Sequence, residues 1–295
     1  MAAFRGASAK VFGLKDNKSA LPYLLLIPGL LWLAIFFIVP IFSLGQMSTK
    51  VPGADIGEFV QEYRFSNYID AFNSSKEQFL RSFLYGLLAT IIALAIAYPL
   101  AYAIAFKSGK WKNILLVLVV APFFVSFLLR TIAWKQILGE EGPVVSVLRT
   151  LNIISVNTSI TSSAFAVVTG LAYNFLPFMT LPLYASLERI DPRTLEAAGD
   201  LYANGFTTFR KVTLPLSMPG VVAGTLLTFI PAAGDYINAT ILGSPSNKML
   251  GNVIEARFFK IVDYPAAAAL SFTLMAAILI LITIYTKRTG TEELV

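Results

Sequence analysis

The sequence predicts an all-α integral membrane protein with six transmembrane helices, and two observations support that prediction. The 295-residue chain is 56% hydrophobic and only 14% charged, and its mean hydropathy is +0.71. Because a soluble globular domain carries about 25% charged residues, this composition indicates a membrane protein. In addition, six uncharged runs are long enough, or nearly long enough, to cross a bilayer as a helix, which takes about 20 residues.

The predicted helices follow these runs in chain order. The first run, between Lys18 and Lys50, is longer than the core of a cleaved signal segment, which has about 7 to 15 residues, so we expect an uncleaved first helix. The third run meets Arg130, and the fifth ends at Asp235. We expect the helices at roughly 21–47, 78–106, 112–138, 161–187, 214–242 and 264–286, in a single transmembrane domain covering residues 1–295.

Many prolines lie within the predicted helices, and each one removes a backbone donor and can kink its helix. Proline is generally enriched in membrane helices, which explains any single one of them. Together they favour a bundle with bent or broken helices, as transporters have. These residues are Pro28, Pro40, Pro99, Pro122, Pro177, Pro182, Pro219 and Pro231.

The distribution of lysine and arginine predicts that the N- and C-termini are cytoplasmic, because cytoplasmic segments are enriched in these residues. With that orientation, 13 of the 23 basic residues lie inside, at a higher density than outside: Arg5, Lys10, Lys15, Lys18, Lys107, Lys110, Lys112, Arg189, Arg193, Arg210, Lys211, Lys287 and Arg288. The net charge of +6 then reflects a basic face beside anionic lipid of the bilayer, and no nucleic-acid partner is expected.

The residue content excludes several kinds of chemistry. The chain has no cysteine and no histidine, which excludes disulfides, thiolate and histidine acid–base chemistry, and ordinary zinc sites. It also has no GxxxxGK[ST] phosphate-binding loop. We therefore expect no cofactor and no catalytic residues in this chain, and if ATP drives its activity, another subunit binds the nucleotide.

Residues 188–215 form the longest predicted cytoplasmic segment between helices. Asp191-Pro192 is a helix-start signal, and Asn204-Gly205 is a turn signal. The surrounding sequence predicts two short amphipathic helices. Physical reasoning alone leaves two interpretations open: the helices lie on the membrane surface, or their apolar face docks into a groove on a soluble partner.

The string EAA in this segment, followed by LPLxxPG, resembles the cytoplasmic loop of ABC importer permeases, the binding-protein-dependent transport inner-membrane component family. The family pattern EAAxxxG…LP is matched by Glu196, Ala197, Ala198, Leu214 and Pro215. Tyr202 stands where the family has a glycine, so we expect Asn204-Gly205 to take over the turn. The resemblance implies that this loop sits in a cleft of an ATPase subunit, with Glu196, Ala197, Ala198, Tyr202, Gly205, Leu214 and Pro215 as coupling residues.

The resemblance extends over nearly the whole chain. The stretches PYLLLIPGLLWLAIFFIVPIFSL, APFFVSFLLRTIAWKQIL and GDYINATILGSPSNKMLGNVIEARF are similar to the polyamine branch of the family, the spermidine/putrescine permeases. This implies a type I ABC importer permease (MetI-like) bundle in the bacterial cytoplasmic membrane that imports polyamines. The implied partners are a cytoplasmic ATPase dimer, a second and different permease subunit, and an extracytoplasmic substrate-binding protein.

Three alternatives to a polyamine permease remain at this point. Related permeases carry ferric iron, sulfate or molybdate, or thiamine, and they share much of this pattern. An intramembrane enzyme lacks visible acid–base residues here. An ATP-independent secondary transporter leaves the EAA loop unexplained.

Charged and aromatic residues at membrane depth are candidates for the substrate pathway. The Asp235 carboxylate would attract a cation, and Tyr236, Trp134 and Tyr173 offer aromatic faces for cation–π contact. Each also has an ordinary interpretation: a helix-end acid for Asp235, and interface or helix–helix contacts for the aromatic residues. For Arg130, we favour a structural ion pair, for which Asp235 is the candidate partner. Glu140 and Glu141 are expected to be solvated loop charges, with Asn174 a further residue that could line the path.

Overall fold

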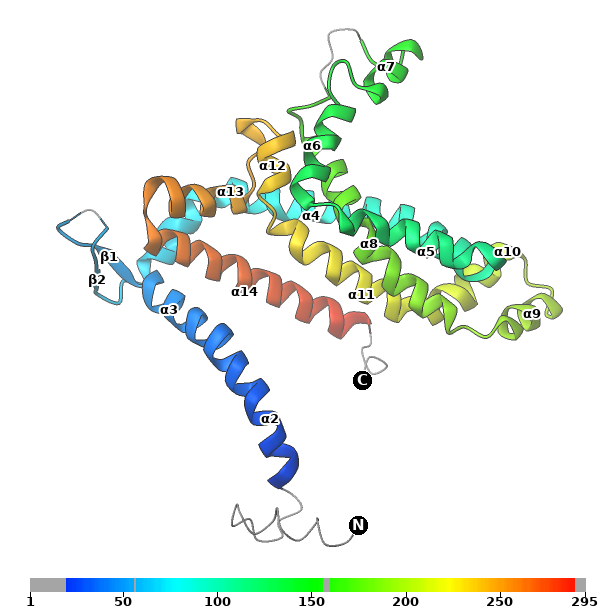
Figure 1. Ribbon diagram of the computed structural model, residues 1–295, viewed down its shortest axis with the longest axis horizontal. Coiled ribbons are helices and arrows are strands. Elements are labelled where there is room, and N and C mark those ends of the chain that lie inside the picture. Colours follow the sequence, from blue (N-terminus) through cyan, green and yellow to red (C-terminus); the bar gives the residue numbers. More distant parts are fainter. Residues whose placement is uncertain (1–19, 56, 156–159, 290–295) are drawn as a thin grey trace, which may run out of the picture.

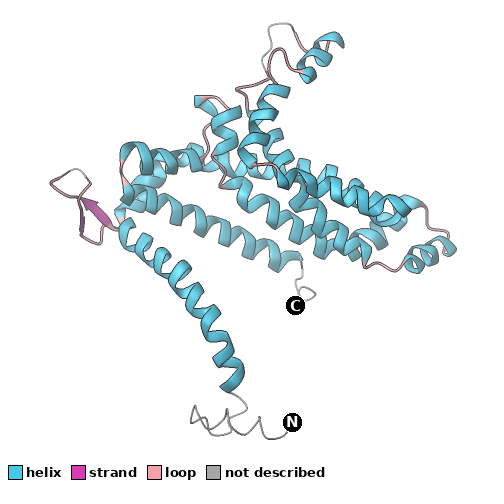
Figure 2. Ribbon diagram, in the orientation of Figure 1, coloured by secondary structure: helices cyan, strands magenta, loops and turns pink. Residues whose placement is uncertain are grey.

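The chain folds into an elongated helical bundle with one small hairpin, as seen in a computed structural model (Figures 1 and 2). The structure describes residues 20–55, 57–155 and 160–289. Four long helices dominate it: α4 (Ser66–Phe106), α8 (Ala164–Glu188), α11 (Leu214–Ala233) and α14 (Tyr264–Thr289). The shorter α-helices are α2 (Ala20–Leu33), α3 (Val39–Ser48), α5 (Lys112–Val120), α6 (Phe127–Ile137), α7 (Pro143–Thr150), α9 (Pro192–Asp200), α10 (Gly205–Thr208), α12 (Ile237–Leu242) and α13 (Leu250–Glu255). The prediction of an all-α membrane protein is confirmed.

Within the described residues, five helices are long and apolar enough to cross a membrane: Tyr23–Ser48, Ser66–Phe106, Ala164–Glu188, Gly205–Ala233 and Tyr264–Arg288. A sixth span exists only if two segments, Gly109–Phe124 and Phe127–Ile137, count together across a bend of 99°. The continuous helix expected at 112–138 is therefore wrong. Pro122 lies in a 3-10 turn at Ala121–Phe124, and Val125 follows in an extended conformation, so the helical hydrogen-bond ladder is interrupted there.

Two other predicted boundaries also differ from the structure. The helix expected at 214–242 ends at Ala233, and α12 is a separate short helix. The helix expected at 78–106 begins twelve residues earlier, at Ser66, because its first turns are polar and extend beyond the apolar run. Of the eight prolines expected to bend or break helices, six lie inside α-helices that continue past them: Pro28, Pro99, Pro177, Pro182, Pro219 and Pro231.

Small side chains allow the central helices α4, α8 and α11 to pack closely. Ala89, Ala93, Ala97 and Ala101 recur every four residues along one face of α4, and all are fully buried. On α11, Gly220 lies against α8 so tightly that an added Cβ would come 2.5 Å from the Cβ of Ser186. Small residues at helix crossings are typical of membrane bundles, where close packing stabilises association.

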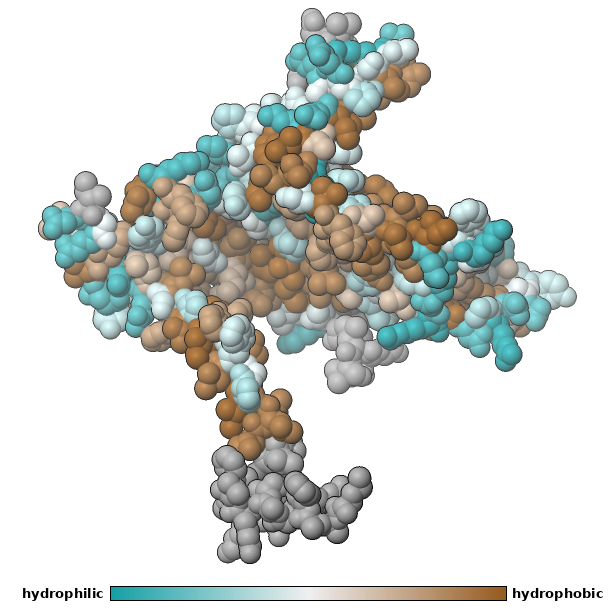
Figure 3. Space-filling view, viewed as in Figure 1, coloured by the Kyte–Doolittle hydropathy of each residue, from teal (hydrophilic) through white to brown (hydrophobic). Residues whose placement is uncertain are grey.

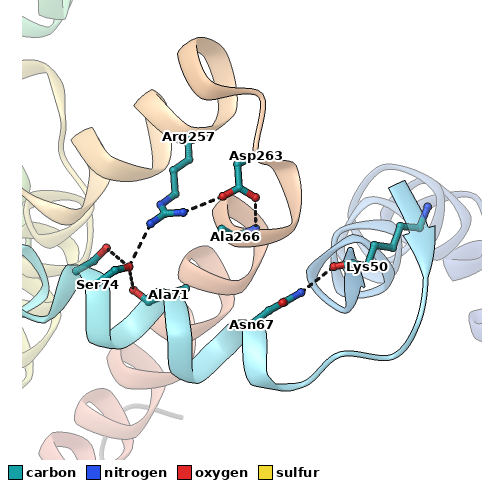
Figure 4. Close-up of polar contacts among 8 residues, drawn as sticks. Lys50, Asn67, Ala71, Ser74, Arg257, Asp263 and Ala266 are labelled. Carbon is teal, nitrogen blue, oxygen red and sulfur yellow. Dashed lines mark hydrogen bonds and ion pairs between the residues drawn. The ribbon is translucent and has the colours of Figure 1, made fainter. Parts of the chain in front are cut away.

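A two-stranded antiparallel hairpin, β1 (Lys50–Pro52) and β2 (Phe59–Gln61), stands at one end of the molecule. The sequence analysis does not predict it. The side-chain amide of Asn67 donates to the backbone oxygen of Ser48 at 2.9 Å and to that of Lys50 at 2.8 Å, the latter shown in Figure 4, and these bonds fix the hairpin to the start of α4.

Arg257 connects the region before α14 to α4 at the same end of the molecule. Its guanidinium lies 2.8 Å from the Asp263 carboxylate and donates to the Ser74 hydroxyl at 3.1 Å (Figure 4). Asp263 also accepts from the backbone N–H of Ala266, and it thereby caps the start of α14.

The helix Tyr23–Ser48 diverges from the bundle and contacts it mainly where α3 meets α14 (Figure 1). No residue in its most apolar window is buried, and its surface is predominantly hydrophobic (Figure 3). In the single chain, this apolar surface is left without a protein partner along most of its length. Such a helix requires lipid or another protein chain around it.

Candidate functional site

The segment between α8 and α11 forms two short helices at the end of the molecule opposite the hairpin (Figure 1). The Asp191 carboxylate accepts from the backbone N–H of Arg193 at 2.9 Å, and Pro192 follows as the first helical residue of α9. Asp-Pro therefore starts the helix as the sequence predicts. After α10, a π-helical turn at Phe209–Thr213 leads directly into α11.

The EAA residues lie in the middle of α9. Glu196 and Ala197 are exposed to solvent, whereas Ala198 is only 8% exposed. Leu214 and Pro215 are the first two residues of α11, so the LP pair marks the return of the chain into the bundle. The exposed surface of α9 at Ala197 thus has no bulky side chain and lies beside the Glu196 carboxylate.

The turn after α9 is formed at Tyr202, and the expected shift of this turn to Asn204-Gly205 is wrong. Tyr202 has a φ of 59°, in the left-handed region. Its backbone N–H donates to the carbonyl of Gly199 at 2.9 Å, and that of Ala203 donates to the carbonyl of Ala198 at 3.1 Å. These two bonds make a Schellman motif, which places the left-handed residue two positions after the last helical residue, Asp200. The length of α9 therefore fixes the turn at Tyr202.

Asn204 has a different role from the one expected. Its backbone is extended, with a φ of −71° and a ψ of 165°, and its side-chain oxygen accepts from the N–H of Thr207 at 2.8 Å. Asn204 is thus the N-cap of α10, and Gly205 is the first residue of that helix.

Two contacts fix the ends of this loop to the bundle and a third joins α4 to α11 beside it, none of which the sequence analysis identifies. Phe209 packs edge-on against the Tyr98 ring of α4, with ring centroids 5.4 Å apart. The Tyr98 hydroxyl also lies 2.6 Å from the hydroxyl of Ser217 on α11. At the other end, Lys112 of α5 forms an ion pair with Glu188 at the end of α8. A movement of the loop would therefore reach α4, α5, α8 and α11 directly.

Two of the candidate pathway residues lie together. The rings of Trp134, on α6, and Tyr173, on α8, stack with centroids 5.1 Å apart and planes at 4°. Asp235 is 9% exposed and lies between α11 and α12, where its carboxylate accepts from the N–H of Asn238 at 2.8 Å. Tyr236 is 44% exposed.

A buried polar chain connects these two places. The Asn174 amide donates to the hydroxyl of Thr131 on α6 and to the side-chain oxygen of Asn238 on α12, both at 3.0 Å. Asn174 is adjacent to Tyr173 in α8, and Asn238 contacts Asp235 as described above. Thr131 and Asn238 were missed by the sequence analysis, because single polar residues in apolar runs reveal a network only once the helices meet.

Several polar atoms along this chain have no hydrogen-bond partner among the described residues: Nε of Arg130, Nε1 of Trp134, Oδ1 of Asn174 and Nδ2 of Asn238. Buried polar groups in proteins are nearly always satisfied, and at membrane depth they are costly. These four atoms gather where α6, α8 and α12 meet.

The favoured ion pair for Arg130 is not formed in the described part of the chain, where no carboxylate lies within 4 Å of its guanidinium. The guanidinium lies over the rings of Phe123 and Phe127, at 5.7 and 5.6 Å, and donates weakly to the backbone oxygen of Asn174 at 3.5 Å. Cation–π contacts therefore replace the expected ion pair.

Comparison with known proteins identifies the family. Residues 97–287 match the model of the family described as binding-protein-dependent transport system inner membrane component. The chain belongs to this family. The matched region contains the EAA loop and all four candidate pathway residues, and the chain is an ABC importer permease by family.

Related curated proteins share sequence with a large part of the chain. It is 42% identical over 176 residues to the spermidine/putrescine transport system permease protein PotB of Haemophilus influenzae, covering 60% of this chain and 62% of that protein. For PotB of Escherichia coli K12, the identity is 38%, covering 60% and 64%. The permease YdcU of the same strain is 35% identical over 198 residues, covering 63% and 62%. The matched part of the chain thus spans less than two thirds of each relative.

Solved structures show the same fold. A chain in the crystal structure of a bacterial ABC transporter involved in import of the acidic polysaccharide alginate aligns with a TM-score of 0.69, covering 94% of this chain and 97% of that one, at 17% identity. The multi-pass bundle is therefore that of ABC importer permeases.

Proposed function

We propose that this chain is the permease subunit of an ATP-driven importer and forms the translocation path for polyamines such as spermidine and putrescine. The observation that carries the proposal is the loop at 188–215. It presents the EAA residues at one end of the bundle and is anchored by Phe209, which packs on Tyr98 of α4, and by the Lys112–Glu188 pair, while Tyr98 also lies within hydrogen-bond distance of Ser217 on α11.

The coupling residues of this proposal are Glu196, Ala197, Ala198, Tyr202, Gly205, Leu214 and Pro215. Closure of the ATPase subunits moves α9, and the anchors pass that motion to α8 and α11. Asn174 lies on α8, and Asp235 lies just after the end of α11 and bonds Asn238, so the same motion changes access to the pathway. Catalysis of ATP hydrolysis belongs to the partner, since the chain has no phosphate-binding loop.

Polyamines as the substrate are supported by the names of the relatives and by the chemistry of the pathway residues. Asp235 supplies a carboxylate, while Trp134, Tyr173 and Tyr236 supply aromatic faces, and together these suit an elongated cation. Arg130 is a cation near this path, but its charge lies against two phenyl rings.

The partners in this proposal are a cytoplasmic ATPase dimer, a second and different permease subunit, an extracytoplasmic substrate-binding protein, and the lipid bilayer. The unpartnered apolar helix Tyr23–Ser48 supports a second permease, which would cover part of that surface. In the proposed orientation, the EAA loop faces the cytoplasm and the hairpin faces outward. The distribution of basic residues predicts that both ends of the chain are cytoplasmic, but these ends lie outside the described residues.

The experiment is reconstitution of the chain with its neighbouring-gene products in liposomes, followed by substrate-stimulated ATPase and uptake assays. Spermidine and putrescine are compared with ferric iron, sulfate, molybdate and thiamine. The proposal expects stimulation and uptake with the polyamines alone. Stimulation only by an anion would remove the polyamine assignment, and uptake without any ATPase subunit would remove the importer assignment.

A further inference from the structure

An open groove of about 740 Å³ lies between α3, the hairpin and α14, at the place where α3 and α14 meet (Figure 1). Its volume is in the range of about 300–1,000 Å³ that is typical of small-molecule sites. Gly45 of α3 and Phe272 of α14 both line it, and a Cβ added at Gly45 would come 3.6 Å from the Phe272 ring. Both helices belong to segments long and apolar enough to span a membrane, so the groove reaches into the bilayer.

The lining of this groove changes from apolar to polar along α3. Ile41 and Phe42 form its apolar part together with the Phe272 ring. Eight residues further on, about 12 Å along the helix axis, the chain reaches the hairpin. The side of the groove next to the hairpin is polar and is lined by Gln46, Thr49, Lys50 and Gln61. An apolar channel with a polar mouth at the end of a spanning helix suits an amphiphile that has an acyl chain and a head group.

Lys50 gives the polar mouth a positive charge. Among the described residues, no carboxylate lies within 4 Å of its ammonium group. Its side chain extends away from Asn67 and from the Arg257–Asp263 pair (Figure 4). A lysine just beyond the end of a spanning helix places its charge at the level of the lipid head groups. A lipid phosphate is therefore the counter-charge that this position offers to Lys50.

The size of the lining side chains favours a lipid over a helix of another protein. Helix crossings in membranes are enriched in small residues, as the alanine face of α4 and Gly220 illustrate in this chain. The apolar wall of the groove instead carries the bulky side chains Ile41, Phe42 and Phe272. A flexible acyl chain can lie between such side chains, whereas they would keep the backbone of a second helix at a distance.

We propose that this groove binds a phospholipid with an anionic head group. Lys50 and Gln46 hold the phosphate, and an acyl chain lies along Phe42 and Phe272. In the orientation proposed above, the lipid belongs to the outer leaflet. It fills the space between the helix Tyr23–Ser48 and α14, and it thereby supports the angle at which that helix leaves the bundle. The inference depends neither on the transported substrate nor on the ATPase.

The test is native mass spectrometry of the assembled transporter, purified in detergent and titrated with dioleoylphosphatidylglycerol. Two other probes separate the parts of the ligand: dioleoylphosphatidylcholine has the same chains without a net charge, and glycerol 3-phosphate has the phosphate without chains. We expect the wild type to bind phosphatidylglycerol more tightly than phosphatidylcholine and not to bind glycerol phosphate. Equal affinity for the two lipids would overturn the inference, and so would tight binding of glycerol phosphate.

Two variants and a matched control locate the binding. Lys50→Gln should lower the affinity for phosphatidylglycerol about fivefold, the effect of one lysine near anionic lipid, and should remove the preference over phosphatidylcholine. Phe42 is 66% exposed, so Phe42→Ala leaves the fold intact and should weaken binding of both lipids. Lys76→Gln is the control, because Lys76 is an exposed lysine on α4 outside the groove. An equal loss of affinity for Lys76→Gln and Lys50→Gln would show that the groove is not the site.

A photo-crosslinking experiment identifies the occupant of the groove in a bilayer. The chain has no cysteine, so the variant Gln46→Cys can carry a single benzophenone maleimide in transporter reconstituted with phosphatidylcholine and phosphatidylglycerol. We expect the crosslinked product to contain phosphatidylglycerol. A crosslink to the second permease in place of lipid would show that a protein covers the groove and would overturn the inference, while the importer assignment would stand.

Discussion

An added methyl group at Gly220 would clash with the neighbouring helix α8. The substitution Gly220→Ala would place a Cβ 2.5 Å from the Cβ of Ser186, 2.7 Å from the carbonyl oxygen of Pro182 and 3.1 Å from the Cα of Leu183. All three positions are set by the backbone of α8, so none of them can move aside by changing a rotamer. Helices α8 and α11 would have to separate by roughly 1 Å to restore ordinary contact distances.

Overpacking of this kind typically costs about 1–3 kcal/mol. We expect Gly220→Ala to lower the thermal unfolding midpoint of the purified protein in detergent. Because α8 and α11 flank the EAA loop, substrate-stimulated ATPase activity of the assembled transporter should fall as well. Gly29→Ala is the control, since Gly29 lies in α2 with nothing within 4 Å of the added Cβ. If both variants unfold at the wild-type temperature, the close α8–α11 crossing described here is wrong.

Two further predictions concern the proposed pathway. Asn174→Ala removes both 3.0 Å hydrogen bonds that join α8 to Thr131 and Asn238. Leaving those buried groups unpaired should lower the free energy of unfolding by about 1–3 kcal/mol, and substrate uptake in proteoliposomes should drop. A variant as stable as the wild type would contradict the network. Asp235→Asn keeps an oxygen that can accept from the Asn238 N–H but removes the negative charge. Uptake of spermidine and putrescine should therefore weaken, mainly at low substrate concentration, while the thermal unfolding midpoint stays the same. Unchanged uptake would show that Asp235 is not part of the pathway.

The uncharged runs located the five helices that are long and apolar enough to cross a membrane, because a bilayer demands uninterrupted apolar length, but they did not reveal the break within 112–138 or the end of α11 at Ala233. The sequence did not show which proline breaks a helix. Pro177 and Pro182 lie inside a continuous α8, whereas Pro122 lies at a 99° bend. The difference depends on whether neighbouring segments satisfy the freed backbone groups, and that is a property of the packed structure.

The EAA loop and the proposed pathway also depend on contacts that local sequence patterns do not predict. Asp191-Pro192 predicted the start of α9 correctly, because helix capping depends on local sequence. Whether Tyr202 or Gly205 is the turn residue depended instead on where α9 ends. A preference for glycine at positive φ pointed to Gly205, and the hydrogen bonds of the Schellman motif outweighed it at Tyr202. The network of Thr131, Asn174 and Asn238 joins three helices that are far apart in sequence, so no local pattern could reveal it.

The coupling role of the EAA loop is the central claim, and Ala197 tests it most directly because this residue is exposed and a change there leaves the fold of the chain intact. The measurement is ATP hydrolysis by the reconstituted transporter, stimulated by the substrate-loaded binding protein, for Ala197→Glu against Ala197→Ser. A buried, unpaired charge at a central interface position costs at least about 2 kcal/mol, roughly thirtyfold in affinity. Ala197→Glu should therefore lose stimulated hydrolysis and uptake, while the small, neutral serine retains them. Full stimulation of the Ala197→Glu transporter would contradict the account.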